Sequence, residues 1–585
     1  MKTADLVFDR LKDWGVSMVF GLPGDGINGF IEALRARQKD IRFIQVRHEE
    51  AAALMACGYA KYTGRLGVCL ATSGPGAIHL LNGLYDAKLD GAPVLALTGQ
   101  TYHDLVGTRY QQEVDLLSLF KDVSVYNQQL LSSGQAEALV DAGCRAALAC
   151  RGVAHLTCPV DLQEQSLSED EPSAKKVANH TSSAWTPPIV IPQDHDLEAA
   201  ASLLNSGKKT VILAGQGTLK AGDEVELCAD RLAAPVVKPL LGKAAVPDDS
   251  PYTTGGIGLL GTLPSELAME ECDSLLMVGT SFPYLEYYPR SDRAHAVQID
   301  SDPTRIGLRF PIDIGLTGDA KATLRALLPK LQRRTDRSFL DKAQSRMKEW
   351  DELMQTREAR DDVPLKPQVV AHHLNQLLAK DAIISTDAGT VTTWVARHIK
   401  IQRGQQFSCS GTLATMGAGL PYAIAAKLAF PDRQCVAFVG DGGFSMLMAD
   451  FATAVKYEAP ITIVVIKNNT LGMIKWEQMV FLGNQEYGVE LHPIDFVQFA
   501  QACGGAGFRC ETPDQVRPAL QRALSSGLPS IVEAVVDPFE PPMPARVSAK
   551  QALHMAESLA KGQPNRGRIA LTLFRNKVSD LKGKR

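Results

Sequence analysis

Several features that would point to particular classes of protein are missing from this 585-residue sequence. No apolar run approaches the roughly 20 residues that a membrane-spanning helix needs. The 11 cysteines are scattered and include no Cys-x-x-Cys pair, so they predict buried, reduced thiols. The first residues continue directly into a helical pattern without a secretory leader, which favours a cytoplasmic protein. A net charge of −4 gives no reason to expect nucleic acid as a partner.

What the chain does contain is an ordinary globular composition, with 45% hydrophobic and 22% charged residues. Its length exceeds what one hydrophobic core holds, so about three domains are expected. Short β-branched runs alternate with helical patterns, which predicts parallel, doubly wound sheets. We therefore predict an α/β protein of three doubly wound parallel-sheet domains and a C-terminal helical tail, with boundaries at residues 1–175, 190–335, 360–545 and 546–585. The polar, proline-broken stretch 168–188 predicts the first linker.

Two strand ends in the third domain carry the most distinctive residues of the chain. One apolar run ends at Gly440-Asp441-Gly442-Gly443, and a helical pattern follows over 446–457. The next apolar run, 461–466, is followed by Asn468-Asn469. In a parallel sheet both ends lie at the same edge, where α/β proteins bind ligands. A carboxylate and a carboxamide suit Mg²⁺, and glycines at a helix start let backbone N–H groups approach a phosphate.

The Gly-Asp-Gly run with this spaced Asn pair resembles the thiamine diphosphate (ThDP) motif. The resemblance extends over nearly the whole chain to the group of pyruvate oxidases, quinone-dependent pyruvate dehydrogenases and acetolactate synthases. A lone Gly-Asp-Gly is usually only a tight turn, but the Asn pair between two apolar strands makes the motif much more specific. The resemblance implies that Asp441, Asn468 and the carbonyl of Thr470 hold Mg²⁺. Asn469 is the alternative to Asn468.

The resemblance also implies which residues contact ThDP. Met416 resembles the bulky apolar residue that wedges under the cofactor and imposes its bent conformation, and plain core packing is the alternative for this methionine. The other implied contacts lie in loops and helix starts after strands: Gly24, Gly74, Gly389, Thr390, Ala414, Gly440, Gly442, Gly443, Leu471, Gly472 and Met473.

Glu49 is the implied catalytic acid. It follows a strand over 41–46 and begins a helix that is rich in alanine. In the family, the first acid after this histidine hydrogen-bonds the aminopyrimidine ring of ThDP and so promotes loss of the thiazolium proton. The alternative is an exposed acid in the first turn of a helix, stabilised by the helix dipole, and Glu50 fits that alternative better. His48 is left unassigned.

Two further residues are implied to act on the substrate. Gln112 keeps the residue type expected of the family, and Glu477 would assist protonation or position the intermediate, with a solvated helix acid as the alternative. Two departures lie near the expected substrate pocket. Gln111 stands where an aromatic residue is usual, and Gly26 stands where a hydroxyl residue is common. The identity of the 2-oxo acid is therefore left open, pyruvate included.

The central domain resembles the FAD segment of pyruvate oxidases. Glycines after its strands would let an extended dinucleotide lie against the backbone, and Asp300 would accept a hydrogen bond from a ribose hydroxyl. The implied FAD contacts are Gly215, Gly217, Gly258, Leu259, Leu260, Thr280, Ser281, Phe282, Pro283, Tyr284 and Asp300. Decarboxylases of the same superfamily keep this domain without flavin, which is the alternative.

The first and third domains repeat one pattern. Gly74 and Gly440, like Pro93 and Pro460, are offset by almost the same number of residues. We interpret the two domains as related pyrimidine-binding and diphosphate-binding units, and convergent patterning is the alternative. In the family the cofactor bridges these units from different subunits, which implies a homodimer or homotetramer with shared active sites.

The C-terminal tail is basic and has a short apolar face. Quinone-dependent relatives use such a segment to reach the membrane, and this composition would suit an anionic surface on the cytoplasmic face. A helix packed on the body of its own protein is the preferred alternative, because the apolar face is short. The residues concerned include Arg566, Arg568, Ile569, Leu573, Phe574, Arg575 and Lys577.

Together these features predict a flavoprotein oxidoreductase. A ThDP ylide would decarboxylate a pyruvate-like 2-oxo acid, and FAD would oxidise the enamine and pass electrons to oxygen or a quinone. The second hypothesis is a carboligase of the acetolactate synthase type with structural FAD. The third is a catalytically silent cofactor-binding protein, and the presence of both Glu49 and Asp441 argues against it.

Overall fold

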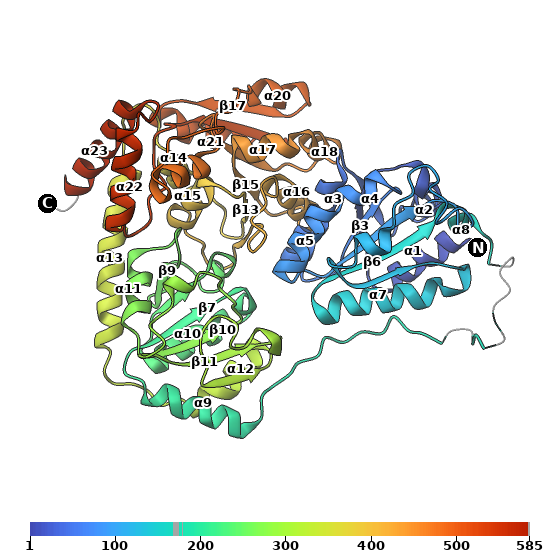
Figure 1. Cartoon of the computed structure of the whole chain (residues 1–585), viewed down its shortest axis with the longest axis horizontal. Helices are drawn as coiled ribbons and strands as arrows, with labels where there is room; N and C mark the ends of the chain where they lie inside the picture. The colour runs from blue at the N-terminus through green and yellow to red at the C-terminus, as the bar shows by residue number, and fades with distance from the viewer. Residues whose placement is uncertain (168–172, 174, 178–179, 583–585) are drawn as a thin grey trace.

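A computed structural model describes residues 1–582 except 168–172, 174 and 178–179. Part of the predicted linker 168–188 and the last three residues of the tail therefore lie outside the described residues. The described chain forms three α/β domains, each built on a six-stranded sheet (Figure 1). Every strand pairing within the three sheets is parallel, which confirms the predicted fold class.

The first domain has the strand order β2-β1-β3-β4-β6-β5. Its strands are β1 (Met18–Gly21), β2 (Arg42–Gln45), β3 (Gly67–Ala71), β4 (Val94–Gln100), β5 (Ser124–Gln129) and β6 (Val153–Pro159). Its helices are α1 (Thr3–Asp13), α2 (Asn28–Ala36), α3 (Glu49–Thr63), α4 (Pro75–His79), α5 (Leu81–Asp90), α6 (Leu116–Leu119), α7 (Ala136–Cys150) and α8 (Val160–Glu164). Helices α3 and α5 cover one face of the sheet, and α1, α2 and α7 cover the other.

The central domain has the order β12-β11-β10-β7-β8-β9. Its strands are β7 (Thr210–Ala214), β8 (Val236–Lys238), β9 (Thr253–Gly256), β10 (Ser274–Val278), β11 (His295–Asp300) and β12 (Ile314–Thr317). Its helices are α9 (Asp194–Ser206), α10 (Gly222–Leu232), α11 (Leu263–Glu271) and α12 (Ala320–Leu327), and α13 (Ser338–Glu358) leads to the third domain. Helices α9, α10 and α12 share one apolar core, and α11 lies in the core of the opposite face.

The third domain has the order β14-β13-β15-β16-β18-β17, which repeats the order of the first domain. Its strands are β13 (Ile383–Thr386), β14 (Gln406–Ser408), β15 (Cys435–Gly440), β16 (Thr462–Lys467), β17 (Ala506–Cys510) and β18 (Ser530–Val535). Its helices are α14 (Pro367–Asn375), α15 (Thr390–His398), α16 (Gly419–Ala429), α17 (Asp441–Leu447), α18 (Phe451–Lys456), α19 (Gly472–Trp476), α20 (Phe496–Ala502) and α21 (Pro513–Leu524). The shared order agrees with the interpretation of two related units.

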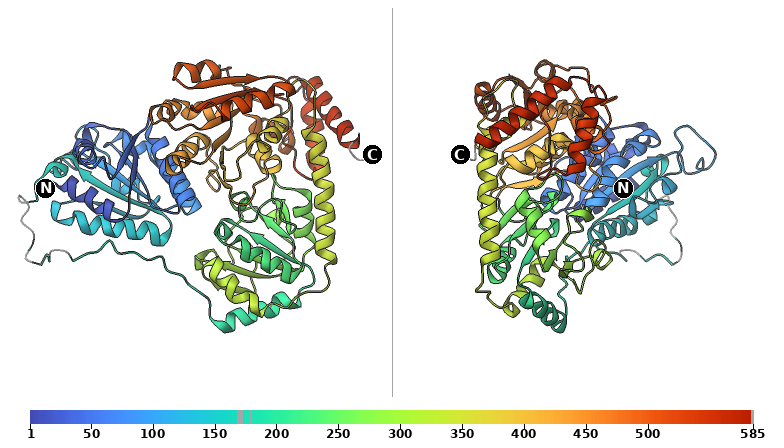
Figure 2. Two further views of the ribbon diagram at one scale, coloured as in Figure 1. Left: turned by 180° about the vertical axis from the view of Figure 1, so that it is seen from behind. Right: turned by 60° about the vertical axis from the view of Figure 1, so that its left-hand side comes forward.

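The first and third domains pack through α3 and α16. Their buried residues belong to one hydrophobic cluster, and the two domains lie side by side in every view (Figures 1 and 2). Small residues on α3 permit the close approach, because a Cβ on Gly58 would lie 3.0 Å from the ring of Tyr422. The hydroxyl of Tyr62 donates to the carbonyl of Ile384 across the same contact, at 3.2 Å. The second half of α3 thus serves a domain interface.

The helix after β15 begins earlier than its apolar pattern indicates. The pattern predicts a helix over 446–457, whereas α17 begins at Asp441 and α18 ends at Lys456. A Cβ on Gly443 would lie 2.2 Å from Oδ2 of Asp387, and one on Gly442 would lie 3.1 Å from Leu471. The two glycines are therefore part of the helix, where their lack of a side chain lets neighbouring loops approach its first turn.

The tail packs on the body of its own chain. Helices α22 (Ala549–Ala560) and α23 (Arg566–Lys582) contribute Met555 and Ile569 to an apolar cluster with Trp476, Met479 and Val480. Arg357 of α13 pairs with Asp580 at 2.8 Å. Among the described residues, no helix combines the length and the hydropathy that crossing a bilayer requires.

Because the buried face of the tail is already occupied, we expect no specific binding of the full chain to anionic vesicles. Leu571 and Phe574 remain 48% and 66% exposed, so they are the residues to change in a test of membrane binding. In a liposome co-sedimentation assay, the full chain and a Leu571→Ser/Phe574→Ser variant should sediment equally. Retention of the full chain alone on the vesicles would establish the membrane hypothesis instead.

Candidate active site

Asp441 lies at the carboxyl edge of the third sheet, as the first residue of α17. Its Oδ2 accepts the backbone N–H of Asn469 at 2.6 Å and that of Asn468 at 3.2 Å, and its Oδ1 accepts the N–H of Gly442 at 3.0 Å. Burial raises the pKa of the Asp441 carboxyl to about 6, against the opposing effect of these hydrogen bonds. The two predicted strand ends therefore meet as the sequence indicated.

The Asn468 side chain points to the other predicted cofactor residues. Its Oδ1 accepts the N–H of Thr470 at 3.1 Å, and a Cβ on Gly472 would lie 3.2 Å from its Nδ2 and 3.1 Å from Cγ2 of Thr390. The carbonyl of Thr470 accepts the N–H of Gly472 at 2.8 Å. Asn469 takes a left-handed backbone conformation with φ of 53°, which turns the chain between Asn468 and Thr470. The choice of Asn468 rather than Asn469 as the metal ligand stays a prediction.

Met416 and Leu471 flank the start of α17. A Cβ on Gly442 would lie 3.5 Å from Cε of Met416 and 3.1 Å from Cδ2 of Leu471. Met416 belongs to a loop in which Ala414 has a positive φ of 55°. Gly389 also has a positive φ, 124°, and immediately precedes α15, whose first residue is Thr390. Met416, Leu471 and Gly442 are thus gathered at one helix start.

Asp387 is a site residue that the sequence reasoning did not select. It follows β13, is fully buried, and accepts the N–H of Gly417 at 3.0 Å through Oδ2 and that of Ala388 at 2.9 Å through Oδ1. Asp387 therefore connects the loop 411–417, called the Met416 loop below, to the first turn of α17 at Gly443. The signal was present, since an acid directly follows a strand at the same sheet edge as Asp441.

Burial raises the pKa of Asp387 from its ordinary value of 3.8 to about 7. As the pH rises, Asp387 loses its proton in the unfolded chain near pH 4, but in the folded protein only near pH 7. The contribution of Asp387 to the stability of the fold is therefore complete below about pH 4 and is lost as the pH rises to 7. The free energy of unfolding of the apoprotein should fall, relative to an Asp387→Asn variant, by up to about 1.4 kcal/mol per pH unit across this range. Urea unfolding of both proteins at several pH values measures the difference, and parallel profiles would contradict it.

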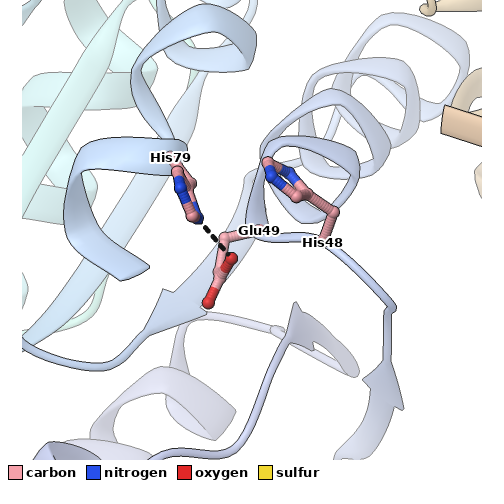
Figure 3. A group of neighbouring side chains, drawn as sticks. All are labelled: His48, Glu49 and His79. Atoms are coloured by element: carbon pink, nitrogen blue, oxygen red, sulfur yellow. Dashed lines mark hydrogen bonds and ion pairs between the residues drawn. The ribbon is translucent and has the colours of Figure 1, made fainter. Parts of the chain in front are cut away.

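Glu49 is the first residue of α3 and is buried, with 8% of its side chain exposed. Its Oε2 lies 2.9 Å from Nδ1 of His79 on α4 (Figure 3). His48 caps α3, since its Nδ1 accepts the N–H of Glu50 at 3.1 Å. The burial fits a functional acid, and the exposed first-turn acid is not what the structure shows.

Gln112 lies against the loop that follows β3. The hydroxyl of Ser73 donates to Oε1 of Gln112 at 3.3 Å, and a Cβ on Gly74 would lie 2.8 Å from the Gln112 carbonyl. Gly24 meets the same loop, because its Cβ would lie 2.5 Å from Cβ of Thr72. A Cβ on Gly26 would lie 2.5 Å from Oγ of Ser73, which explains why no larger residue stands at Gly26.

The first domain also holds the Met416 loop of its own chain. Nδ2 of Asn82 donates to Oε1 of Glu50 at 2.6 Å and to Oγ1 of Thr415 at 2.9 Å. Asp90 accepts the N–H groups of Gly411 and Thr412, each at 2.8 Å. The loop is therefore fixed at both ends by α5, the helix that packs beside α3.

Three family models match successive parts of the chain. They are described as the thiamine pyrophosphate enzyme N-terminal TPP binding domain over residues 1–119, the central domain over 197–327, and the C-terminal TPP binding domain over 387–534. The chain is 45% identical over 553 residues to the putative thiamine pyrophosphate-containing protein YdaP of Bacillus subtilis (strain 168), covering 94% of each protein. This chain belongs to the thiamine pyrophosphate enzymes. Thiamine pyrophosphate is another name for ThDP.

Two further relatives of this thiamine pyrophosphate enzyme have different names. The pyruvate oxidase of Lactiplantibacillus plantarum is 34% identical over 542 residues, which covers 92% of this chain and 89% of that protein. The probable acetolactate synthase large subunit of Methanocaldococcus jannaschii is also 34% identical, over 559 residues, covering 92% and 93%. Similarity alone therefore does not choose between these two reactions.

In the central domain of the enzyme, the packing of the chain alone accounts for glycine at two of the predicted FAD contacts. A Cβ on Gly215 would lie 2.4 Å from the carbonyl of Gly279, and one on Gly217 would lie 2.7 Å from its Cα. The ends of β7 and β10 thus require glycine because their backbones touch. Gly258 differs, since its φ is 97° and its Cβ would lie 3.2 Å from the ring of Phe282.

The remaining predicted FAD contacts line this same end of the central sheet. Thr280 and Phe282 are buried, and Tyr284 is 55% exposed, with its ring 5.5 Å from that of Phe282. Leu260 and Ser281 are partly buried, and Pro283 is exposed. Asp300 ends β11, its Oδ1 accepts the N–H of Asp302 at 3.0 Å, and burial raises its pKa.

Glu477 lies where the central and third domains meet. It begins a π-helical turn, Glu477–Phe481, and lines a small pocket with Leu259, Met473 and Trp476. Burial raises the pKa of Glu477, so it is not the fully solvated helix acid of the alternative reading. Arg397 fixes Leu259 beside it by donating to the carbonyls of Leu259 and Gly261, at 3.1 and 3.2 Å.

Proposed function

We propose that this enzyme binds Mg²⁺ and FAD beside ThDP and oxidatively decarboxylates a pyruvate-like 2-oxo acid, with oxygen or a quinone as the electron acceptor. The observation that carries the proposal is the pocket in which Leu259 of the central domain meets Met473 and Glu477 of the third domain. A flavin held by the loop around Gly258 would lie beside residues that follow the Asn468 turn. This proximity would allow electrons to pass from the ThDP site to the flavin.

The Asp441 site fits a divalent cation. Within the described residues, the hydrogen bonds to this carboxylate come from backbone N–H groups, and no ion pair reaches it. A buried carboxylate without a cationic partner is unfavourable, and its raised pKa reports that cost. Oxygens of Asp441, Asn468 and Thr470 are hard donors of the kind that Mg²⁺ selects. These three residues would hold the ion, and the glycines of α17 would approach a diphosphate.

The residues around Gly258 fit a dinucleotide. The positive φ of Gly258 opens the loop before Leu259, and the exposed ring of Tyr284 stands at its side. Asp300 is a buried acid with a raised pKa, which favours a hydroxyl donor such as that of a ribose. The backbone of Gly279 already requires glycine at Gly215 and Gly217, with or without a dinucleotide.

ThDP would supply the electron sink for breaking the carbon–carbon bond, and FAD would accept the two electrons. Glu49 would hold a proton on the oxygen that His79 leaves free. Gln112 has its Oε1 engaged by Ser73, which leaves its amide N–H groups to orient the carboxylate of the oxo acid. Glu477, whose pKa burial raises, would hold a proton beside the reacting carbon. Water takes the acyl group, so one acceptor is reduced for each CO₂ released.

The test compares pyruvate with bulkier 2-oxo acids, with and without an artificial electron acceptor. Reduction of the acceptor in step with CO₂ release is the expected result. Acetolactate or acetoin formed without reduction would favour the carboligase, which the equal identity to the acetolactate synthase relative makes the second candidate. Absence of CO₂ from every acid would contradict both enzymatic proposals.

We also propose that the active sites are shared in a homodimer or homotetramer, with Glu49 of one subunit serving the cofactor held by Asp441 of another. Co-expression of Glu49→Gln and Asp441→Asn chains tests this. Hybrid dimers would contain one site with both native residues, and the mixture should recover about a quarter of wild-type activity. Each variant alone is the control. A mixture as inactive as the single variants would show that one chain supplies both residues.

A further inference from the structure

We propose that His79 is a positioning residue for Glu49, and that it holds one carboxylate oxygen so that the other faces the aminopyrimidine of ThDP. This inference rests on the proposed ThDP chemistry. It starts from one contact, in which Nδ1 of His79 lies 2.9 Å from Oε2 of Glu49. The glutamate side chain is 8% exposed and the histidine side chain 45% exposed, so the pair joins a buried acid to the open side of the site.

The His79 ring is oriented from its other side by His48. The two rings stack with centroids 4.5 Å apart and an interplanar angle of 29°. Figure 3 draws both rings with Glu49. His48 is itself fixed, because its Nδ1 accepts the N–H of Glu50 as the cap of α3. That nitrogen is therefore an acceptor, which leaves the ring proton of neutral His48 on Nε2. The start of α3 thus fixes both Glu49 and His48, and His48 orients the ring of His79.

The two oxygens of Glu49 have different surroundings. Oε2 faces His79, whereas Oε1 lies 3.1 Å from the position that a Cβ on Gly76 would take. Gly76 and His79 are three residues apart on α4 and so lie on one face of that helix. The loop before α4 contacts Gln112 through Ser73, and we assign Gln112 to binding the substrate. Oε1 is therefore the oxygen left for the cofactor, on the side where the glycine gives room.

A hydrogen bond to Oε2 restricts rotation of the carboxyl group about its last torsion. Without it, Oε1 would sample orientations that do not face the pyrimidine, and proton exchange would slow although the cofactor stays bound. Misplacement of a reacting group by about 1 Å can cost 100-fold in rate. Loss of the His79 hydrogen bond should therefore slow proton transfer separately from any loss of ThDP affinity.

Two variants divide the roles of the ring. His79→Phe keeps a ring for stacking on His48 and removes the hydrogen bond, whereas His79→Asn removes the ring and keeps a polar side-chain atom near the place of Nδ1. With the full-length protein and saturating ThDP and Mg²⁺, the exchange of the ThDP C2 proton for deuterium is measured by acid quench and NMR. The dissociation constant of ThDP is measured by fluorescence titration.

We expect His79→Phe to slow the exchange by about 10- to 100-fold with an affinity for ThDP within about threefold of wild type. His79→Asn should recover most of the exchange rate. The inference is overturned if His79→Phe exchanges as fast as wild type, if its affinity falls as much as its exchange rate, or if His79→Asn is no better than His79→Phe. If the wild-type protein itself does not accelerate exchange, the proposed ThDP chemistry fails instead.

Discussion

Replacing Asp441 by asparagine is expected to weaken ThDP binding in the presence of Mg²⁺ by about 100-fold, which corresponds to about 3 kcal/mol. Asparagine keeps the volume and one acceptor oxygen for the backbone N–H of Asn469, so the loop geometry should persist. It removes the negative charge that offsets the ion. Because the wild-type carboxylate has only backbone donors among the described residues, the charge has no structural partner whose loss would confuse the result.

Fluorescence titration with ThDP, at fixed Mg²⁺ and again with a chelator, measures this effect. Asp432→Asn is the matched control, since Asp432 is an exposed acid on the same segment of chain. Wild type should lose affinity when Mg²⁺ is removed, and Asp441→Asn should respond much less. Equal ThDP affinity in wild type and Asp441→Asn would rule out the metal role of this residue.

Replacing Glu49 by glutamine is expected to lower turnover by about 10²- to 10⁴-fold, the range for loss of a general acid–base group. Glutamine retains the shape of the side chain and an oxygen for His79, so ThDP should still bind. The loss should therefore appear in kcat while the dissociation constant of ThDP changes little. Steady-state kinetics and a cofactor titration on the same preparation separate the two quantities.

The neighbouring acid provides the control for Glu49. Glu50→Gln keeps the oxygen that accepts from Asn82, and the structure gives Glu50 no place in the chemistry. We expect Glu50→Gln to retain most of the wild-type activity. A Glu49→Gln enzyme as active as Glu50→Gln would remove Glu49 from the mechanism.

Local sequence patterns predict much of the fold, and they also predict that Asp441 and Asn468 lie close together in the candidate site. The apolar runs before Gly440 and Asn468 each predict a strand, and parallel pairing then brings Asp441 to the Asn468 turn without further information. The burial of Glu49 needed more, since the same acid could have been an exposed first-turn residue. Its position became clear only from α4, whose Gly76 and His79 close over it.

Long-range crowding explains what the sequence patterns missed. Gly215 and Gly217 are predicted FAD contacts, and β10 brings the backbone of Gly279 against both, which requires glycine there independently of a dinucleotide. Asp387 resembles any acid after a strand, and its importance comes from Gly417 and Gly443, which lie far along the chain. The first turn of α17 was missed because glycines disfavour helices in isolation. None of these contacts can be read from neighbouring residues alone.

The most direct test of the account is a crystal structure of the protein with ThDP and Mg²⁺. The ion should lie about 2.1 Å from side-chain oxygens of Asp441 and Asn468. An oxygen of Glu49, from whichever subunit supplies it, should lie about 3 Å from a ring nitrogen of the aminopyrimidine. Cofactor density away from these residues, or a Glu49 carboxylate that faces bulk water in the occupied assembly, would contradict the account.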